Sequence, residues 1–239
     1  MVLGQALRYI TSFISFALIK VLCHIFYRGE EKWLSDAQKS ELKDVKLMVL
    51  LNHTSLFEPV FIRFASWRYV WLLARRLIVP GADVTMQRPL TGKLLKLILP
   101  GAIPITRKKD DSWSQFLDRV NDDTVAAILP EGRMKRANGL DKFGRTMRVR
   151  GGVADILQNI EHGKILFVYS GGLHHIQKPG VNRFPKVFKT IRVNLELVEI
   201  EEYKAYIENL MEEDRSGDFT RQVMSDMNER LINKIPQAN

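Results

Sequence analysis

The first part of the chain carries one long apolar stretch. Residues 9–27 are interrupted only by Lys20 and His24 among the strongly polar types. This length is close to the roughly 20 residues that cross a bilayer, but a lysine at the centre of a span costs about 2.5–3.5 kcal/mol on insertion scales. We therefore predict a helix that lies in, or dips into, one leaflet, with Arg8, Lys20 and Arg28 near the headgroups. A single span is the second interpretation and a buried core helix the third.

After a polar connection at 30–44, short apolar runs alternate with amphipathic stretches. Strands are predicted at 45–51, 69–73, 102–105, 125–129, 165–169 and 191–197, and helices from Pro59 onward and at 90–98, 113–120, 152–159, 203–213 and 219–235. This alternation is typical of an α/β fold with a mixed, mostly parallel sheet covered by helices, here preceded by a membrane-docking helix. We divide the chain into a membrane-associated N-terminal segment with its connection, 1–42, and an α/β domain with C-terminal helices, 43–239.

The charge of the chain is basic and unevenly distributed. It has 36 Lys and Arg against 27 Asp and Glu, a formal net charge of +9. The basic residues concentrate at 63–109 and 133–150, whereas 196–214 is acidic. The basic part of the chain suits binding to a membrane surface, to phosphates on a small substrate, or to nucleic acid. Charge alone does not choose among these partners. Cys23 is the only cysteine, which excludes a disulfide framework and a cysteine zinc site.

A histidine and a glutamate follow the apolar run at 45–51. His53 and Glu58 are five residues apart, and on a regular helix such residues point roughly 140° away from each other. Pro59 disfavours helix at Glu58 and suits the first helical position itself. We therefore predict a compact strand-to-helix turn in which the carboxylate orients the imidazole as a general base. A pair that only caps a helix is the alternative.

No activated nucleophile accompanies this histidine. Ser55 lacks the Gly-x-Ser-x-Gly surroundings of a nucleophile elbow, and Cys23 lies in the apolar stretch. The base would therefore act on a hydroxyl of the substrate.

Two further predicted strand ends carry arginine. The run at 102–105 leads to Arg107, and the run at 125–129 leads to Pro-Glu-Gly-Arg, which ends at Arg133. In an open α/β sheet the carboxyl ends of strands line the ligand crevice. Arginine offers a planar fork that matches phosphate, and Gly132 lets the backbone approach a ligand closely. Either arginine alone also fits an ordinary surface charge.

Together these blocks resemble the glycerolipid acyltransferase family. The first family block, Asn-His-x-x-x-x-Asp, is matched by Asn52, His53 and Glu58 in a His-x-x-x-x-Glu form. The second, an apolar strand with a final Arg, is matched by 102–107, and the third, a hydrophobic strand followed by Pro-Glu-Gly, by 128–132. Order and spacing also agree, and the resemblance runs from about Val45 to Tyr169.

The resemblance implies an acyltransferase of phospholipid biosynthesis. His53 would deprotonate the acceptor hydroxyl with Glu58 as its orienting group, and Arg107, Glu131, Gly132 and Arg133 would hold the phosphate end of the acceptor. The acyl group would pass from an acyl-CoA or acyl-carrier-protein thioester to a lysophospholipid, foremost 1-acyl-sn-glycerol-3-phosphate, to give phosphatidic acid. No metal and no permanently bound cofactor is implied. The partners would be membrane lipids, with no nucleic acid, and the location the cytoplasmic face of the inner or cell membrane.

The sequence also departs from the family pattern. Glu58 stands where Asp is usual, Arg133 stands where Thr followed by Arg is commonest, and no Pro follows the run at 165–169. These departures leave open another lysolipid acceptor, or a catalytically silent membrane-associated lipid-binding protein. His174 and His175 are adjacent and therefore point in different directions, so we interpret them as part of a polar loop and not as a metal pair.

Overall fold

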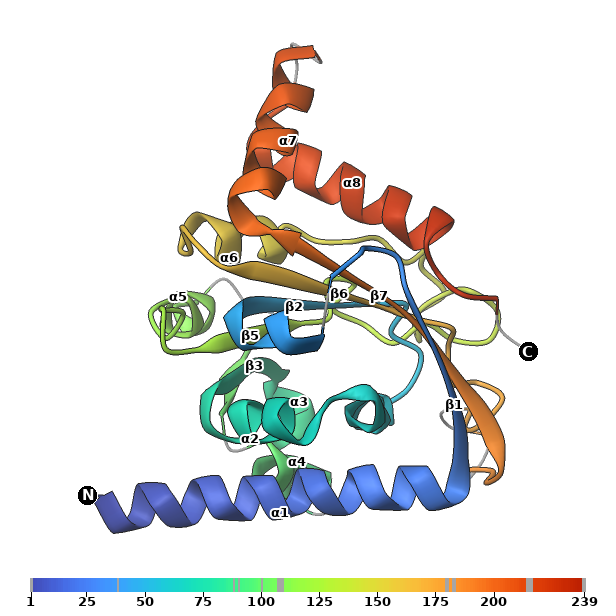
Figure 1. The fold of residues 1–239 in the computed structure, drawn as a ribbon. Coiled ribbons are helices and arrows are strands. Elements are labelled where there is room, and N and C mark those ends of the chain that lie inside the picture. The colour runs from blue at the N-terminus through green and yellow to red at the C-terminus, as the bar shows by residue number, and fades with distance from the viewer. Residues whose placement is uncertain are drawn as a thin grey trace.

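A central sheet lies between two layers of helices, with a long N-terminal helix along the outside of one layer (Figure 1). The structure is a computed structural model. It describes residues 2–37, 39–87, 89, 91–99, 101–106, 110–178, 181, 184–213 and 217–237.

The described strands form one sheet in the order β1-β7-β6-β2-β5-β3-β4. Their bounds are β1 (Tyr27–Trp33), β2 (Val45–Leu51), β3 (Leu77–Ala82), β4 (Ala102–Ile105), β5 (Val125–Ile128), β6 (Lys164–Ser170) and β7 (Lys189–Glu199). Neighbouring strands are parallel except for the antiparallel pair β6 and β7. The predicted mixed, mostly parallel α/β sheet is confirmed.

The helices form the two outer layers. Their bounds are α1 (Val2–Phe26), α2 (Trp67–Arg76), α3 (Asp83–Met86), α4 (Thr91–Ile98), α5 (Ser112–Leu117), α6 (Gly152–Gln158), α7 (Ile200–Glu213) and α8 (Phe219–Asn233), with 3-10 helices η1 (Lys39–Asp44) and η2 (Glu58–Phe64). Figure 1 shows α1, α2 and α4 on one side of the sheet and α6, α7 and α8 on the other.

Strand β2 is buried in the middle of the sheet. Every second side chain of this strand is fully buried, and Leu47, Val49 and Leu51 pack in one cluster with Ile156 of α6. On the opposite face of the sheet, buried residues of β6 and β7 form a second cluster with Phe16 of α1. Because both faces of the sheet are covered, the position of the carboxyl end of β2 is fixed by the core.

The predicted strand at 69–73 is wrong, because this segment belongs to helix α2. Ser66 caps the helix, its hydroxyl accepting a hydrogen bond from the backbone N–H of Tyr69 over 3.2 Å. Tyr69, Val70 and Leu73 form the buried face, whereas Trp67 and Trp71, one turn apart, are exposed. The alternating aromatics suggested a strand, but tertiary burial follows the helical spacing.

Two strands were not predicted. The polar strand β1 lies at the edge of the sheet and pairs only with β7, so its side chains lack the apolar alternation that marks a half-buried strand. Strand β3 contains Pro80 and Gly81, which indicate a turn in a sequence. Val79–Ala82 of this strand pairs with β4, and only Leu77 and Ile78 pair with β5. The missing N–H of Pro80 therefore breaks no ladder on the β5 side.

Lys20 of α1 is buried in the protein, so the prediction that places it near headgroups is wrong. Its ammonium group donates to the backbone carbonyls of Arg63 and Ala65 at 2.6 and 2.7 Å. In return, the guanidinium of Arg63 donates to the carbonyls of Cys23 and Tyr27 at 2.8 and 2.9 Å. Carbonyls at a helix end have no partner within the helix, so α1 and η2 each cap the other.

Candidate active site

The turn after β2 brings His53 and Glu58 together. Nδ1 of His53 lies 3.0 Å from Oε1 of Glu58. The same oxygen accepts hydrogen bonds from the backbone N–H groups of Thr54 and Ser55, both over 3.0 Å. Pro59 takes the first turn of η2 directly after Glu58. The turn has the compact geometry that the sequence predicts, and one carboxylate oxygen holds both the imidazole and the backbone beside it.

The charges around His53 favour its protonated form. Burial alone would lower the pKa of the imidazole, but contact with the Glu58 carboxylate and the nearby charge of Glu131 outweigh this, so the pKa of His53 is raised above its ordinary value of 6.5. Since Nδ1 lies 3.0 Å from the Glu58 carboxylate, Nε2 is the nitrogen that can accept a proton from a substrate.

Glu131, at the turn after β5, is buried and bonded to the backbone of the His53 turn. Its Oε1 accepts from the N–H groups of Asn52 and His53, at 2.7 and 3.1 Å. Burial raises the pKa of the Glu131 carboxyl, although the hydrogen bonds oppose this change. These contacts indicate a positioning role for Glu131, in contrast to the contact with the acceptor that the resemblance implies.

Asn52 connects the turn to the end of β6. Its backbone adopts a φ of 68°, a left-handed conformation that asparagine tolerates better than most residues. Its side-chain amide donates to the carbonyl of Ser170 over 2.8 Å, and Thr54 accepts from the N–H of Leu173 over 2.8 Å. The carboxyl ends of β2, β5 and β6 are therefore tied together around His53.

Arg133 is already paired within the protein. Its Nη1 forms an ion pair with Asp141, and its guanidinium carbon lies 5.2 Å from the ring centre of Phe143. Two backbone N–H groups and Arg133 together hold the pKa of Asp141 at about 2, although burial opposes this. Arg133 can therefore bind a phosphate only through the guanidinium N–H groups that Asp141 does not occupy.

Gly132 and the segment after it lie against the histidine turn. Gly132 is exposed and has a φ of 62°, so this position favours glycine. The N–H of Lys135 donates to the carbonyl of His53 over 2.7 Å. The structure thus brings Glu58, Glu131 and the chain from Gly132 to Lys135 around His53. Arg107 lies outside the described residues.

Asp141 and His174 are residues of this edge that sequence reasoning did not select. Asp141 had a signal, because it is the only acidic residue between Arg133 and Arg150. His174 approaches the carbonyl of Lys135 at 2.8 Å, whereas His175 approaches that of Thr190 at 2.8 Å. The two histidines therefore contact different parts of the chain, and burial lowers the pKa of His174.

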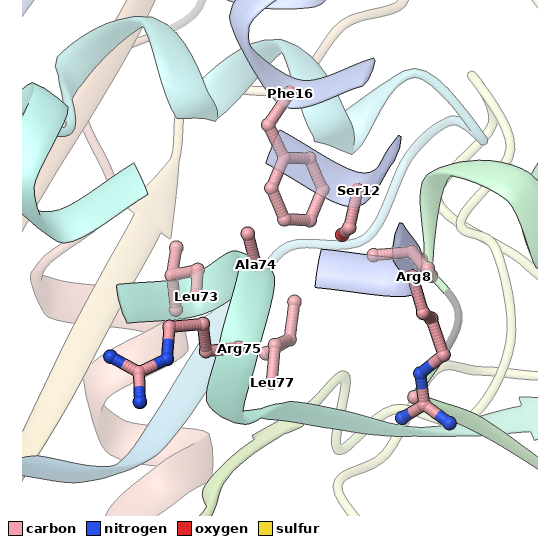
Figure 2. Close-up of a pocket in the computed structure, with 9 residues that line it drawn as sticks. Arg8, Ser12, Phe16, Leu73, Ala74, Arg75 and Leu77 are labelled. Carbon is pink, nitrogen blue, oxygen red and sulfur yellow. The ribbon is translucent and has the colours of Figure 1, made fainter. Parts of the chain in front are cut away.

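A small pocket lies elsewhere, between α1 and α2. Ser12, Phe16, Leu73 and Ala74 line it, and Figure 2 shows the guanidinium groups of Arg8 and Arg75 extending away from its apolar part. No residue of the histidine turn lines this pocket. We therefore place the candidate reaction site at the strand ends around His53.

Fold and site together define an α/β enzyme with a carboxylate-held histidine at the carboxyl edge of its sheet. The family model described as Acyltransferase matches residues 24–170, which is more than half of the chain, and the protein belongs to this acyltransferase family. The resemblance deduced from the three sequence blocks is therefore confirmed.

One similar solved structure is the crystal structure of the 1-acyl-sn-glycerophosphate (LPA) acyltransferase, PlsC, from Thermotoga maritima. It aligns with a TM-score of 0.52 and 11% sequence identity, over 87% of this chain and 71% of that chain. At this identity the likeness is one of fold. No curated protein matches the sequence.

Proposed function

We propose that this acyltransferase moves a fatty acyl group from a thioester donor to the free hydroxyl of a lysophospholipid, with 1-acyl-sn-glycerol-3-phosphate as the foremost acceptor. The observation that carries the proposal is the contact between His53 and Glu58 at the edge of the sheet. The fold shared with a 1-acyl-sn-glycerophosphate acyltransferase supports the choice of acceptor.

The hydroxyls beside His53 support direct transfer without an enzyme-bound acyl group. Ser55 is fully buried, and its oxygen accepts from the N–H of Phe57 and lies 3.4 Å from Gln177. Thr54 is engaged with Leu173. Since both hydroxyls have partners within the protein, the acceptor hydroxyl is the group on which His53 acts.

The mechanism follows from the two nitrogens of the imidazole. Glu58 receives the Nδ1–H, and Nε2 takes the proton of the acceptor hydroxyl while its oxygen attacks the thioester carbonyl. The tetrahedral intermediate then collapses, the carbon–sulfur bond breaks, and the imidazolium returns the proton to the thiolate. Glu131 keeps the turn in place through the backbone of Asn52 and His53. Backbone N–H groups near this turn are the candidates for stabilising the oxyanion.

The anionic ends of both substrates would lie at the basic segment after β5. This segment carries Arg133, Lys135, Arg136, Lys142, Arg145, Arg148 and Arg150, with Asp141 as its single acid. In the sequence, Arg107, which the family pattern assigns to the phosphate, comes two residues after the last residue of β4. Acyl-CoA and acyl carrier protein are both anionic, so the segment suits either donor.

We further propose that α1 rests along one leaflet of a membrane on the cytoplasmic side. The segment Gly4–Phe26 is long and apolar enough to cross a bilayer. The reciprocal caps of Lys20 and Arg63 instead hold the helix against the protein. Large apolar residues remain exposed along its outer face at Leu7, Ile10, Ile14, Leu18, Val21, Leu22 and Ile25. This arrangement favours the monotopic interpretation.

The test is transfer of labelled acyl-CoA to 1-acylglycerol-3-phosphate in lipid vesicles. His53→Ala is expected to lower turnover by about 10²–10⁴-fold, the usual contribution of a general base, without changing thermal unfolding. The matched control is His162→Ala, because His162 is exposed and precedes β6, at the opposite end of that strand. Normal turnover by His53→Ala would overturn the mechanism, and a panel of other lysolipids and a carrier-protein donor would identify the substrates.

A further inference from the structure

Three large apolar side chains lie exposed just before β7. Phe184 and Phe188 are 74% and 69% exposed, and Val187 is 43% exposed. We call these residues the apolar lip. Phe188 also adopts a φ of 58°, a left-handed conformation that is unfavourable for a bulky aromatic residue. A strained backbone that presents an aromatic ring to solvent points to a function for that ring.

The lip continues the outer surface of α1. The N–H of Phe188 donates to the carbonyl of Phe26 over 2.6 Å, and the two rings lie 6.2 Å apart. Phe26 and the preceding Ile25 are both exposed. Figure 1 shows the chain before β7 beside the carboxyl end of α1. The exposed apolar face of the helix therefore meets the lip at Phe26 and Phe188.

The chain at the lip is hydrogen-bonded to the segment that contacts the His53 turn. The N–H of Lys186 donates to the carbonyl of Ile176 over 2.9 Å, and Ile176 is fully buried. A few residues earlier, Leu173 donates to Thr54 in the histidine turn. The lip is thus connected to the turn of His53 through the short segment that contains the buried residues Leu173 and Ile176.

Basic residues surround the lip. Lys186 directly precedes Val187 in the sequence, and Lys189 begins β7. Arg28, in the neighbouring strand β1, pairs with Thr190 of β7. Aromatic rings flanked by lysine and arginine match the boundary between acyl chains and anionic headgroups. Continuity with a helix that is apolar enough for a bilayer favours a membrane over a protein partner.

We propose that Phe184, Val187 and Phe188 insert into the surface of an anionic bilayer beside α1 and so place the entrance of the His53 site at the membrane. The inference rests on the membrane association proposed for α1. It adds a second contact point close to the site, through which a lipid acceptor can reach His53 without leaving the bilayer.

The first experiment places an environment-sensitive fluorophore on Phe184→Cys and, as a control, on Ile232→Cys. Ile232 is 80% exposed on α8, on the opposite side of the sheet from α1. Burial raises the pKa of the native Cys23 thiol to about 11, so it stays unlabelled. With vesicles of phosphatidylcholine and phosphatidylglycerol, the label at 184 is expected to shift to the blue and to be quenched by spin-labelled lipid, unlike the label at 232.

The second experiment compares Phe184→Ser/Phe188→Asn with Ile232→Ser. The double variant is expected to bind these vesicles at least about tenfold more weakly and to lose a similar factor of turnover on vesicle-embedded acceptor. Turnover of a short-chain acceptor dispersed as monomers is expected to stay at the wild-type level. Thermal stability is expected to change little, because both rings are mostly exposed and asparagine suits the backbone of position 188.

The outcomes separate the lip from the proposed function. A wild-type protein that binds vesicles while the label at 184 stays in a polar environment overturns the lip alone. Unchanged vesicle binding by the double variant overturns it as well. A wild-type protein that does not bind vesicles overturns both the lip and the membrane association of α1. Acyl transfer to the monomeric acceptor tests the reaction independently of either.

Discussion

At the scale of single residues, one carboxylate oxygen organises the site. Oε1 of Glu58 contacts the imidazole of His53 and accepts the N–H groups of Thr54 and Ser55. A glutamate reaches this point because the turn between His53 and Pro59 folds back on itself. The sequence predicted this pair from the position of Pro59, since proline restricts the residue before it. The part of Glu131 in holding the same turn was not predicted, because its partners are backbone groups of another strand end.

The first prediction concerns the pH dependence of turnover. His53 is active as a base only when neutral, and its pKa is raised by Glu58 and Glu131. Activity is therefore expected to be lost as pH falls through this raised pKa. Glu58→Gln keeps an acceptor oxygen but removes the charge, so the pKa of His53 falls. The acid limb of kcat/KM should move to lower pH, with plateau turnover reduced roughly 10²-fold.

A matched control for this profile is Glu201→Gln. Glu201 forms an equivalent contact with His162, an exposed histidine away from the site. Its removal should leave the kcat/KM profile unchanged. If Glu58→Gln keeps the wild-type acid limb, then Glu58 does not control the ionisation of the catalytic base.

Glu131→Ala tests positioning against direct substrate contact. The change leaves two buried N–H groups without their acceptor, and each such loss costs about 1–3 kcal/mol. The free energy of unfolding, measured with urea, is expected to fall by about 2–4 kcal/mol. Glu131→Gln, which retains an acceptor oxygen, should recover part of it. A positioning role predicts a lower kcat with little change in the KM of the acceptor, and a raised KM alone would instead assign Glu131 to substrate binding.

At the scale of elements, hydrogen bonds to carbonyls at helix ends explain how α1 is held against the protein. The apolar run predicted a helix correctly, and Lys20 in its middle was interpreted as a headgroup contact because lysine is costly inside a bilayer. In the folded chain Lys20 meets the free carbonyls at the end of η2, and Arg63 meets those at the end of α1. Burial lowers the pKa of Lys20, as does the charge of Arg63. No local sequence pattern predicts these hydrogen bonds, because Lys20 and its two carbonyl partners are 43 and 45 residues apart in the chain.

The corresponding prediction uses Lys20→Met in detergent micelles. Loss of two charge-assisted hydrogen bonds is expected to lower the free energy of unfolding by about 2–4 kcal/mol. Arg8→Met, an exposed position on the same helix, should change it by no more than about 0.5 kcal/mol. An unchanged unfolding curve for Lys20→Met would mean that α1 is not held against the protein and would favour an independent span.

Helix α2 shows why the periodicity of a short segment can mislead. Trp67, Tyr69 and Trp71 alternate as in a strand, yet Tyr69 is buried and both tryptophans are exposed beside Phe13 of α1, with ring centres 6.5 and 5.2 Å away. The exposed tryptophans lie beside α1, and the buried face of α2 follows the 3.6-residue period. The buried face of α2 packs in one cluster with sheet residues such as Val45 and Leu166 and with Phe16 of α1, so tertiary packing decided which residues are buried.

At the scale of the whole molecule, the described chain has a differently built surface on each side of the sheet. On the α1 side, exposed apolar residues of the helix run toward the lip at Phe184 and Phe188. On the α8 side, the basic segment after β5 ends where the N–H of Val149 meets Asn228 over 3.4 Å. The His53 turn lies between them, bonded to both through Leu173 and Lys135. This arrangement suits a reaction between a lipid acceptor and a water-soluble donor.

A buried charged cluster joins α8 to the sheet. Arg230 of α8 pairs with Asp226 and with Glu196 of β7, at 2.7 and 2.9 Å. It also donates to the hydroxyl of Tyr169 over 2.9 Å. Lys234 adds a second cation on Glu196. The cluster fastens α8 onto the sheet close to the end of β6, and so supports the strand end to which Asn52 is bonded.

The sequence by itself determined the α/β class, the central strand at 45–51, the histidine turn and the acyltransferase family, because each depends on local periodicity, on proline or on short ordered blocks. Tertiary structure alone decided what each side chain faces. The edge strand β1, the burial of Lys20, the pairing of Arg133 with Asp141 and the backbone contacts of Glu131 all depend on residues distant in the chain. Such contacts form because buried polar groups need hydrogen-bond partners. Those partners can lie far away in the chain, so the local sequence pattern does not predict them.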